Sequence, residues 1–165
     1  MFSTVSIVSF VLFYSIEVFS ACESNATLWT YYPCSFIISP TSFDCEDLLV
    51  TTSIDQCVNK EMTFFWHFPF GNMTLTLQAD NNQPFLLRLS QISLSRNKLI
   101  KNTYHLVNKR TSEERLISYD KNELITLHSN KFNQCSVRFE TNNSNIYDYG
   151  TFLRIEIFNA ENRNL

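Results

Sequence analysis

The stretch CSVRFET, residues 135–141, alternates apolar and polar side chains with a period of two. Successive side chains of a strand point to opposite faces, so Val137 and Phe139 would face a core while the charged side chains face solvent. The stretch FLRIEIF, residues 152–158, repeats this alternation near the C-terminus. Both patterns predict strands that cover a hydrophobic core with one face.

Other strand candidates precede these two, at residues 63–68, 73–77, 84–94, 104–107, 116–119 and 123–128. Short segments that recur about every 8–12 residues are typical of a β-sandwich or barrel. No segment has apolar residues at helical spacing over three turns, although a short helical turn is expected around residues 44–50. The sequence therefore predicts one all-β domain, an antiparallel β-sandwich, over residues 21–159, with a polar tail over residues 160–165.

The composition agrees with one folded domain. The chain has 165 residues, of which 44% are hydrophobic and 15% aromatic, with two glycines and four prolines. This length suits a single domain with a real core. Charged residues make up 18% and the net charge is −3, which excludes a histone-like polycation. A disordered acidic tail is excluded by the aromatic content, and nucleic acid is not an expected partner.

The N-terminus has the features of a secretory signal peptide. Residues 5–16 (VSIVSFVLFYSI) form a 12-residue run without charge. A membrane-spanning helix needs about 20 apolar residues, whereas a signal-peptide core is shorter. Val18 and Ser20 are small residues suited to cleavage after Ser20, so residues 1–20 are the predicted signal peptide. A buried N-terminal strand or an uncleaved anchor is the alternative. No later stretch is long enough to span a membrane, and the expected product is secreted and extracellular.

The chain has an odd number of cysteines, all of which would remain after cleavage: Cys22, Cys34, Cys45, Cys57 and Cys135. In an oxidising compartment two disulfides and one thiol are expected, with a connectivity that spacing alone does not fix. The first alternative pairs the four N-terminal cysteines locally and leaves Cys135 buried beside Val137 and Phe139. Cys135 could instead bridge back to the N-terminal segment, or link two chains. No metal site is expected, because no C-x-x-C occurs and the histidines do not cluster with the cysteines.

Three N-x-S/T sequons are candidate N-glycosylation sites, at Asn25, Asn72 and Asn142. None has proline in the middle position, and each could be modified if the chain is secreted. Asn72 directly follows a Phe-Gly pair that is typical of a turn, and Asn142 lies in a polar Asn/Ser cluster. Both are expected where a glycan can be accommodated, which together with the leader and cysteines indicates a secreted glycoprotein.

The last third of the chain resembles the end of a CUB-type domain, a secreted β-sandwich. ITLHSNKF (125–132) leads to CSVRFET, then to a polar turn at 142–145, Gly150 and the strand TFLRIEI (151–157). Residues 62–78, a strand, a Pro-x-Gly turn and a strand, are also similar, as is Cys57 before an aromatic strand. The divergent CUB-like domains of nematode secreted proteins are most similar. The resemblance implies a jelly-roll sandwich, although Cys135 and the N-terminal cysteine spacing depart from the family, and no calcium ligands are carried over.

No arrangement typical of an enzyme occurs in the sequence. There is no G-x-S-x-G and no recognisable Cys/His signature, and two distant glycines cannot form a phosphate-binding loop. Neither catalysis nor a cofactor is therefore expected. His67, in an aromatic run, is expected to be packed. An enzyme would need a cleft where a histidine meets Ser, Cys or a carboxylate, and a binding module is expected to lack this meeting.

Charge and aromatic residues are unevenly distributed. Residues 88–115 carry seven Lys and Arg against two Glu, and residues 21–60 carry five acids against one Lys. The basic flank could bind anionic glycans or lipid head groups, but solvated hairpin ends are the preferred interpretation. The aromatic run at residues 64–70 predicts a core strand. The expected function is that of a secreted, non-catalytic binding module for an extracellular protein or glycan. The alternative is a lipid-binding sandwich with an aromatic-lined cavity, and the oligomeric state is left open.

Overall fold

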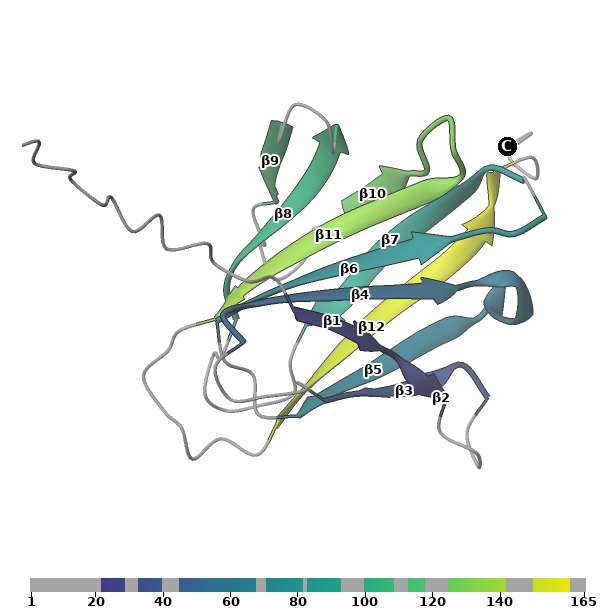
Figure 1. Ribbon diagram of the computed structural model, residues 1–165. Helices are drawn as coiled ribbons and strands as arrows, with labels where there is room; N and C mark the ends of the chain where they lie inside the picture. The colour runs from purple at the N-terminus through teal and green to yellow at the C-terminus, as the bar shows by residue number, and fades with distance from the viewer. Residues whose placement is uncertain are drawn as a thin grey trace, which may run out of the picture.

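Two six-stranded β-sheets pack against each other in the computed structural model of the chain (Figure 1). The structure describes residues 22–28, 33–39, 45–67, 71–81, 83–92, 100–108, 113–117, 125–141 and 150–160. The first described strand begins at Cys22 and the last ends at Asn159. The predicted signal peptide, Asn142 and residues 161–165 of the predicted tail lie outside the described residues.

The strands are distributed between the sheets as follows. Sheet A contains, in spatial order, β1 (Cys22–Asn25), β4 (Asp47–Ser53), β6 (Asn72–Gln78), β11 (Gln134–Thr141), β8 (Ile100–Asn108) and β9 (Glu113–Ile117). Sheet B contains β10 (Ile125–His128), β7 (Phe85–Ile92), β12 (Gly150–Asn159), β5 (Glu61–His67), β3 (Ser35–Ile38) and β2 (Thr27–Leu28). A single turn of 3-10 helix, η1 (Asp55–Cys57), joins β4 to β5 within the described part. The predicted β-sandwich is confirmed.

The alternation that predicted the strands agrees with burial. On β11, Val137 and Phe139 are buried between the sheets, whereas Arg138 and Glu140, which alternate with them, are partly exposed. β11 lies inside sheet A, paired with β6 on one side and β8 on the other. β12 holds the corresponding place inside sheet B, between β5 and β7. The two best alternating stretches are therefore interior strands, where one face must be apolar.

The sheets are mixed rather than antiparallel throughout. Of the pairings that the structure describes, β1 with β4, β4 with β6 and β3 with β5 are parallel. A parallel pair needs a connection that crosses over, and here one or two strands of the opposite sheet lie between its members in sequence. The chain passes from β4 in sheet A through β5 in sheet B and back to β6, so β4 and β6 run in the same direction.

The prediction of a helical turn around residues 44–50 is wrong. Strand β4 begins at Asp47, and the 3-10 turn follows it at η1. Leu48 and Val50 are buried while Leu49 between them is 39% exposed. This is the period-two pattern of a strand, and burial of the two apolar side chains against sheet B outweighs the weak local preference of the acidic segment.

The core lies between the sheets and is rich in aromatic side chains. Phe64 and Trp66 of β5 are almost fully buried, as is Phe139 of β11, and they belong to one cluster with residues of both sheets. Burying a side chain of this size contributes about 1.5–3 kcal/mol. The aromatic run therefore supplies a core strand, as predicted; its residues 68–70 lie outside the described part.

Two disulfides connect the N-terminal strands to the rest of the sandwich. They join Cys22 to Cys45 and Cys34 to Cys57, each across 23 residues of sequence. In the chain-entropy model, closing a loop of this length contributes about 3 kcal/mol. The prediction of disulfide bonds is confirmed, and the connectivity is now assigned. Cys135 is buried without a disulfide, in the position expected by the first alternative.

The part of the chain that the structure describes contains no helix that could span a membrane.

Candidate functional site

The outer face of sheet A carries a row of acidic and amide side chains. The strand register places Asp47 of β4 beside Asn72 of β6, Asn72 beside Glu140 of β11, and Glu140 beside Asn102 of β8. Neighbouring strands lie about 4.8 Å apart. Four strands from distant parts of the sequence thus align four polar side chains across the sheet.

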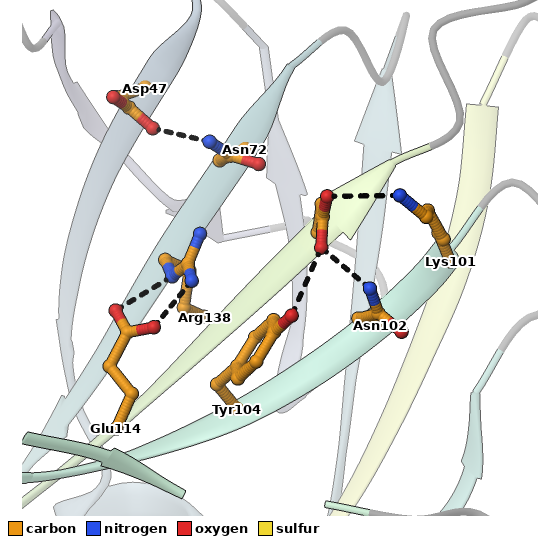
Figure 2. A network of polar contacts seen from close by, with 8 residues as sticks. Asp47, Asn72, Lys101, Asn102, Tyr104, Glu114 and Arg138 are labelled. Carbon is orange, nitrogen blue, oxygen red and sulfur yellow. Dashed lines mark hydrogen bonds and ion pairs between the residues drawn. The ribbon is translucent and has the colours of Figure 1, made fainter. Parts of the chain in front are cut away.

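Hydrogen bonds join these side chains in two separate groups, as Figure 2 shows. The Asn72 amide Nδ2 donates to Asp47 Oδ1 at 2.8 Å. Glu140 Oε2 accepts from Asn102 Nδ2 at 2.7 Å and from the Tyr104 hydroxyl at 3.2 Å, and Lys101 Nζ lies 3.5 Å from Oε1. The hydrogen bond from Asn102, with further contributions from Lys101 and Tyr104, outweighs partial desolvation and lowers the pKa of Glu140. The carboxylate is therefore held in its charged form.

A second row runs parallel to the first and centres on Arg138. Its guanidinium lies 4.5 Å from the centre of the Tyr104 ring, and both Nε and Nη2 donate to the Glu114 carboxylate of β9 (Figure 2). Burial alone would lower the pKa of Arg138, but the hydrogen bond and charge of Glu114 outweigh burial and raise it. The row ends in exposed leucines, Leu49 on β4 and Leu116 on β9.

We call Asn102, Tyr104, Glu114, Leu116, Arg138 and Glu140 the β8–β11 surface. The Arg138 guanidinium and the Tyr104 ring are already oriented. The bidentate pair with Glu114 fixes the guanidinium, and the cation–π contact fixes the ring. A ligand would meet hydrogen-bonding groups of both signs beside exposed Leu116. Tyrosine and arginine together are enriched where proteins bind other molecules. Strand alternation pointed Arg138 and Glu140 outward, but nothing in the sequence indicated that β8 and β9 lie beside them.

The described basic residues of the 88–115 stretch do not form one patch. Arg88 belongs to sheet B, where its guanidinium lies 3.6 Å from Glu156 and 4.8 Å from the centre of the Phe158 ring. Lys101 lies in sheet A beside Glu140. Arg115 of β9 pairs in register with His105 of β8, whose pKa is lowered by burial and then by the charges of Arg115 and His128. The other four basic residues of the stretch lie outside the described residues.

Two of the three sequons fall within the described residues. Asn72 is the first residue of β6, directly after Gly71, whose φ of 68° is typical of the expected turn. Gly71 also lies so close to the Glu46 carbonyl oxygen that a Cβ would be 2.1 Å from it. Asn72 is partly exposed on the outer face of sheet A. Asn25 lies in the edge strand β1, in register with Thr51.

The structure brings a histidine and a serine together, which was not expected of a binding module. Ser39, just after β3, has its Oγ 3.1 Å from Nδ1 of His67, and both residues lie at the outer surface of sheet B. The His67 ring also packs edge-on against Phe65 at 4.5 Å, in line with its expected packed role. A serine–histidine contact is one component of nucleophilic catalysis, which further needs an orienting group and oxyanion donors.

No group of three or more His, Cys, Asp and Glu side chains suited to a metal ion occurs among the described residues. Burial raises the pKa of the Cys135 thiol to about 12, so this cysteine is a neutral core residue. The β8–β11 surface, with its oriented Arg138 and Tyr104, is therefore the candidate site that we consider further. Compared with known proteins, the chain matches no family model, and no curated protein matches it.

Proposed function

We propose that the chain is a secreted, non-catalytic binding module that recognises an extracellular protein or glycan through the β8–β11 surface. The observation that supports this most directly is Arg138, held by Glu114 on one side and stacked on Tyr104 on the other. Side chains fixed before binding lose little conformational freedom when a ligand arrives. The surface therefore has its binding groups already arranged.

The chemistry of the surface suits either class of ligand. Amide, carboxylate, phenol and guanidinium groups offer directional hydrogen bonds to sugar hydroxyls or to a peptide backbone. Leu116, 55% exposed, offers apolar contact at the edge. A protein interface commonly combines Tyr and Arg at its centre with polar groups at its rim.

Secretion is part of the same proposal. The two disulfides fit an oxidising compartment, and the predicted signal peptide would deliver the chain there. The resemblance of the sequence to CUB-like domains, which are extracellular modules, points to the same compartment. Detecting the chain in the medium of a secretory host, cleaved after Ser20, would test this step.

The binding step is tested with a matched pair of arginine variants. The secreted protein, with its N-linked glycans removed enzymatically, is screened against arrayed glycans and extracellular proteins, and each hit is measured with Arg138→Ala and Arg88→Ala treated in the same way. Arg88 makes a cation–π contact and an ion pair like those of Arg138, but on sheet B. We expect at least a tenfold loss of affinity for Arg138→Ala and none for Arg88→Ala. A hit that binds Arg138→Ala at full strength, or a screen without any hit, contradicts the proposal.

The lipid-binding alternative is less well supported. Phe64 and Trp66, which would line a cavity, instead pack in the core shared by both sheets. We expect a fluorescent fatty acid to give no saturable signal with the secreted protein. Saturable uptake that is lost in Trp66→Ala but kept in Arg138→Ala would favour the lipid carrier instead.

A further inference from the structure

The sequon at Asn72 lies beside the β8–β11 surface. In the register of β6 with β11, Asn72 is paired with Glu140 and Thr74, the third residue of the sequon, is paired with Arg138. Met73 between them is fully buried, so the two sequon residues that define the site are the two that share the outer face. The modification signal and the candidate binding surface are thus adjacent across one strand spacing.

We infer that Asn72 carries an N-linked glycan and that this glycan covers the β8–β11 surface, so that occupancy of Asn72 controls access to it. The inference rests on the proposed secretion, because the modification takes place in the secretory pathway. The proposed binding function does not depend on whether Asn72 carries a glycan. A glycosylated chain would have a shielded surface, and an unmodified chain would have an open one.

The attachment chemistry is compatible with the observed contacts. A bond forms between Asn72 Nδ2 and C1 of the sugar as the bond from C1 to the diphosphate of a lipid-linked oligosaccharide breaks. Nδ2 loses one of its two protons in this transfer. The other proton remains and can still donate to Asp47, which Nδ2 contacts at 2.8 Å in the unmodified chain. The sugar then occupies the position on the planar nitrogen that Asp47 does not, and the neighbour on the other side of Asn72 is Glu140.

The distances across the sheet are short enough for a glycan on Asn72 to cover the β8–β11 surface. Glu140 is one strand from Asn72 and Asn102 is two, or about 5 and 10 Å away. An N-linked glycan is bulky and branched, and several sugar rings extend beyond two strand spacings. Asn25 differs, because β1 is the edge strand of sheet A and β4 and β6 separate it from β11. A glycan on Asn25 is therefore not expected to reach Lys101 or Asn102.

The test compares Thr74→Val with Thr74→Ser, both expressed through the secretory pathway as the full chain. Valine removes the sequon while Asn72 and its contact with Asp47 remain, whereas serine keeps the sequon. A bulky polyethylene-glycol amine-reactive ester is the probe, and mass spectrometry measures both glycan occupancy and lysine labelling. Lys101 reports on the surface because its side chain is 58% exposed beside Glu140. Lys131 is the internal control, since this exposed residue precedes β11 at the end far from Glu140.

We expect Lys101 labelling to rise at least threefold in Thr74→Val and to stay at the wild-type level in Thr74→Ser, with Lys131 unchanged in both. Thr27→Val, which removes the sequon of Asn25, should leave Lys101 labelling unchanged. If Thr74→Val does not fold, enzymatic removal of the glycan from the folded wild type provides the same comparison.

The outcomes separate this inference from the proposed function. A secreted chain with Asn25 occupied and Asn72 unmodified overturns the inference alone, and so does equal Lys101 labelling with and without the Asn72 glycan. A chain that is retained in the cell without glycan at either site contradicts the proposed secretion as well. The labelling readout uses no ligand, so the result is independent of whether the screen for partners succeeds.

Discussion

Arg138 and Tyr104 lie directly opposite each other on β11 and β8, with the guanidinium 4.5 Å from the centre of the tyrosine ring. They are 34 positions apart in the sequence. The pair becomes a rigid unit because Glu114 of the next strand holds the guanidinium through two hydrogen bonds. Three strands of one sheet thus contribute to a single oriented surface, and the proposed binding function depends on it.

Gly150 is expected to be required for packing on the outer face of sheet B. A Cβ at this position would lie 2.6 Å from the Phe65 ring and 2.9 Å from the Trp66 carbonyl oxygen. Gly150→Ala should lower the free energy of unfolding by about 1–3 kcal/mol, measured by urea denaturation. The double variant Phe65→Ala/Gly150→Ala should show a smaller effect of the alanine at 150, because the ring is gone. Full stability of Gly150→Ala would argue against this packing.

Cys135 is expected to be unreactive in the folded protein. Its thiol is buried and its pKa is raised to about 12, so almost no thiolate exists at neutral pH. A disulfide-exchange reagent should detect no thiol in the native protein and one thiol after unfolding. Cys135→Ser should lower the free energy of unfolding by about 1–3 kcal/mol, because it buries a hydroxyl without an assured partner. Rapid native labelling, or three thiols after unfolding, would show a different disulfide pattern.

His105 is expected to make stability depend on pH in the mildly acidic range. Burial, and then the charges of Arg115 and His128, lower the pKa of His105 in the folded chain. The unfolded chain therefore binds more protons once the pH falls through about 6.5, the usual value for histidine. The contribution of neutral His105 to the free energy of unfolding is fully present above that pH. It is lost as the pH falls toward the pKa of His105 in the folded chain.

The measurement is the free energy of unfolding in urea at pH 7.5 and pH 5.5. His105→Gln should show a smaller drop between the two than the wild type. Glu140→Gln is the control, because the pKa of Glu140 is also lowered and its contribution is lost only below about pH 4.3, the usual range of a glutamate. An equal drop in wild type and His105→Gln would rule out this role of His105.

The Ser39–His67 contact is expected to be structural. It links the end of β3 to β5 at the surface, where a hydrogen bond contributes about 0.5–1.5 kcal/mol at most. Ser39→Ala should therefore destabilise the fold only slightly, and a fluorophosphonate probe should not label the wild type. Labelling that disappears in both Ser39→Ala and His67→Asn would instead establish a nucleophilic serine and contradict a non-catalytic function.

Local patterns in the sequence predict the strands from β5 to β12 and the faces of the alternating ones, but they do not predict β1 to β4. Val137 and Phe139 are buried where alternation placed them, and Cys135 shares their face. Such predictions succeed because the direction of a side chain along a strand depends only on its neighbours in sequence. The prediction of a helical turn around Asp47 failed because the acidic residues there favour turns locally, whereas burial of Leu48 and Val50 decides the conformation.

Local patterns along the chain predict a β-sandwich with an apolar inner face, two disulfides and one cysteine outside them. The fold adds that Cys22 pairs with Cys45, that β4 and β6 are parallel, and that Tyr104 and Glu114 lie beside Arg138. The physical reason is that strand order and register arise from contacts between segments far apart in the chain. Burial of both inner faces fixes that arrangement, and no short stretch of sequence contains it.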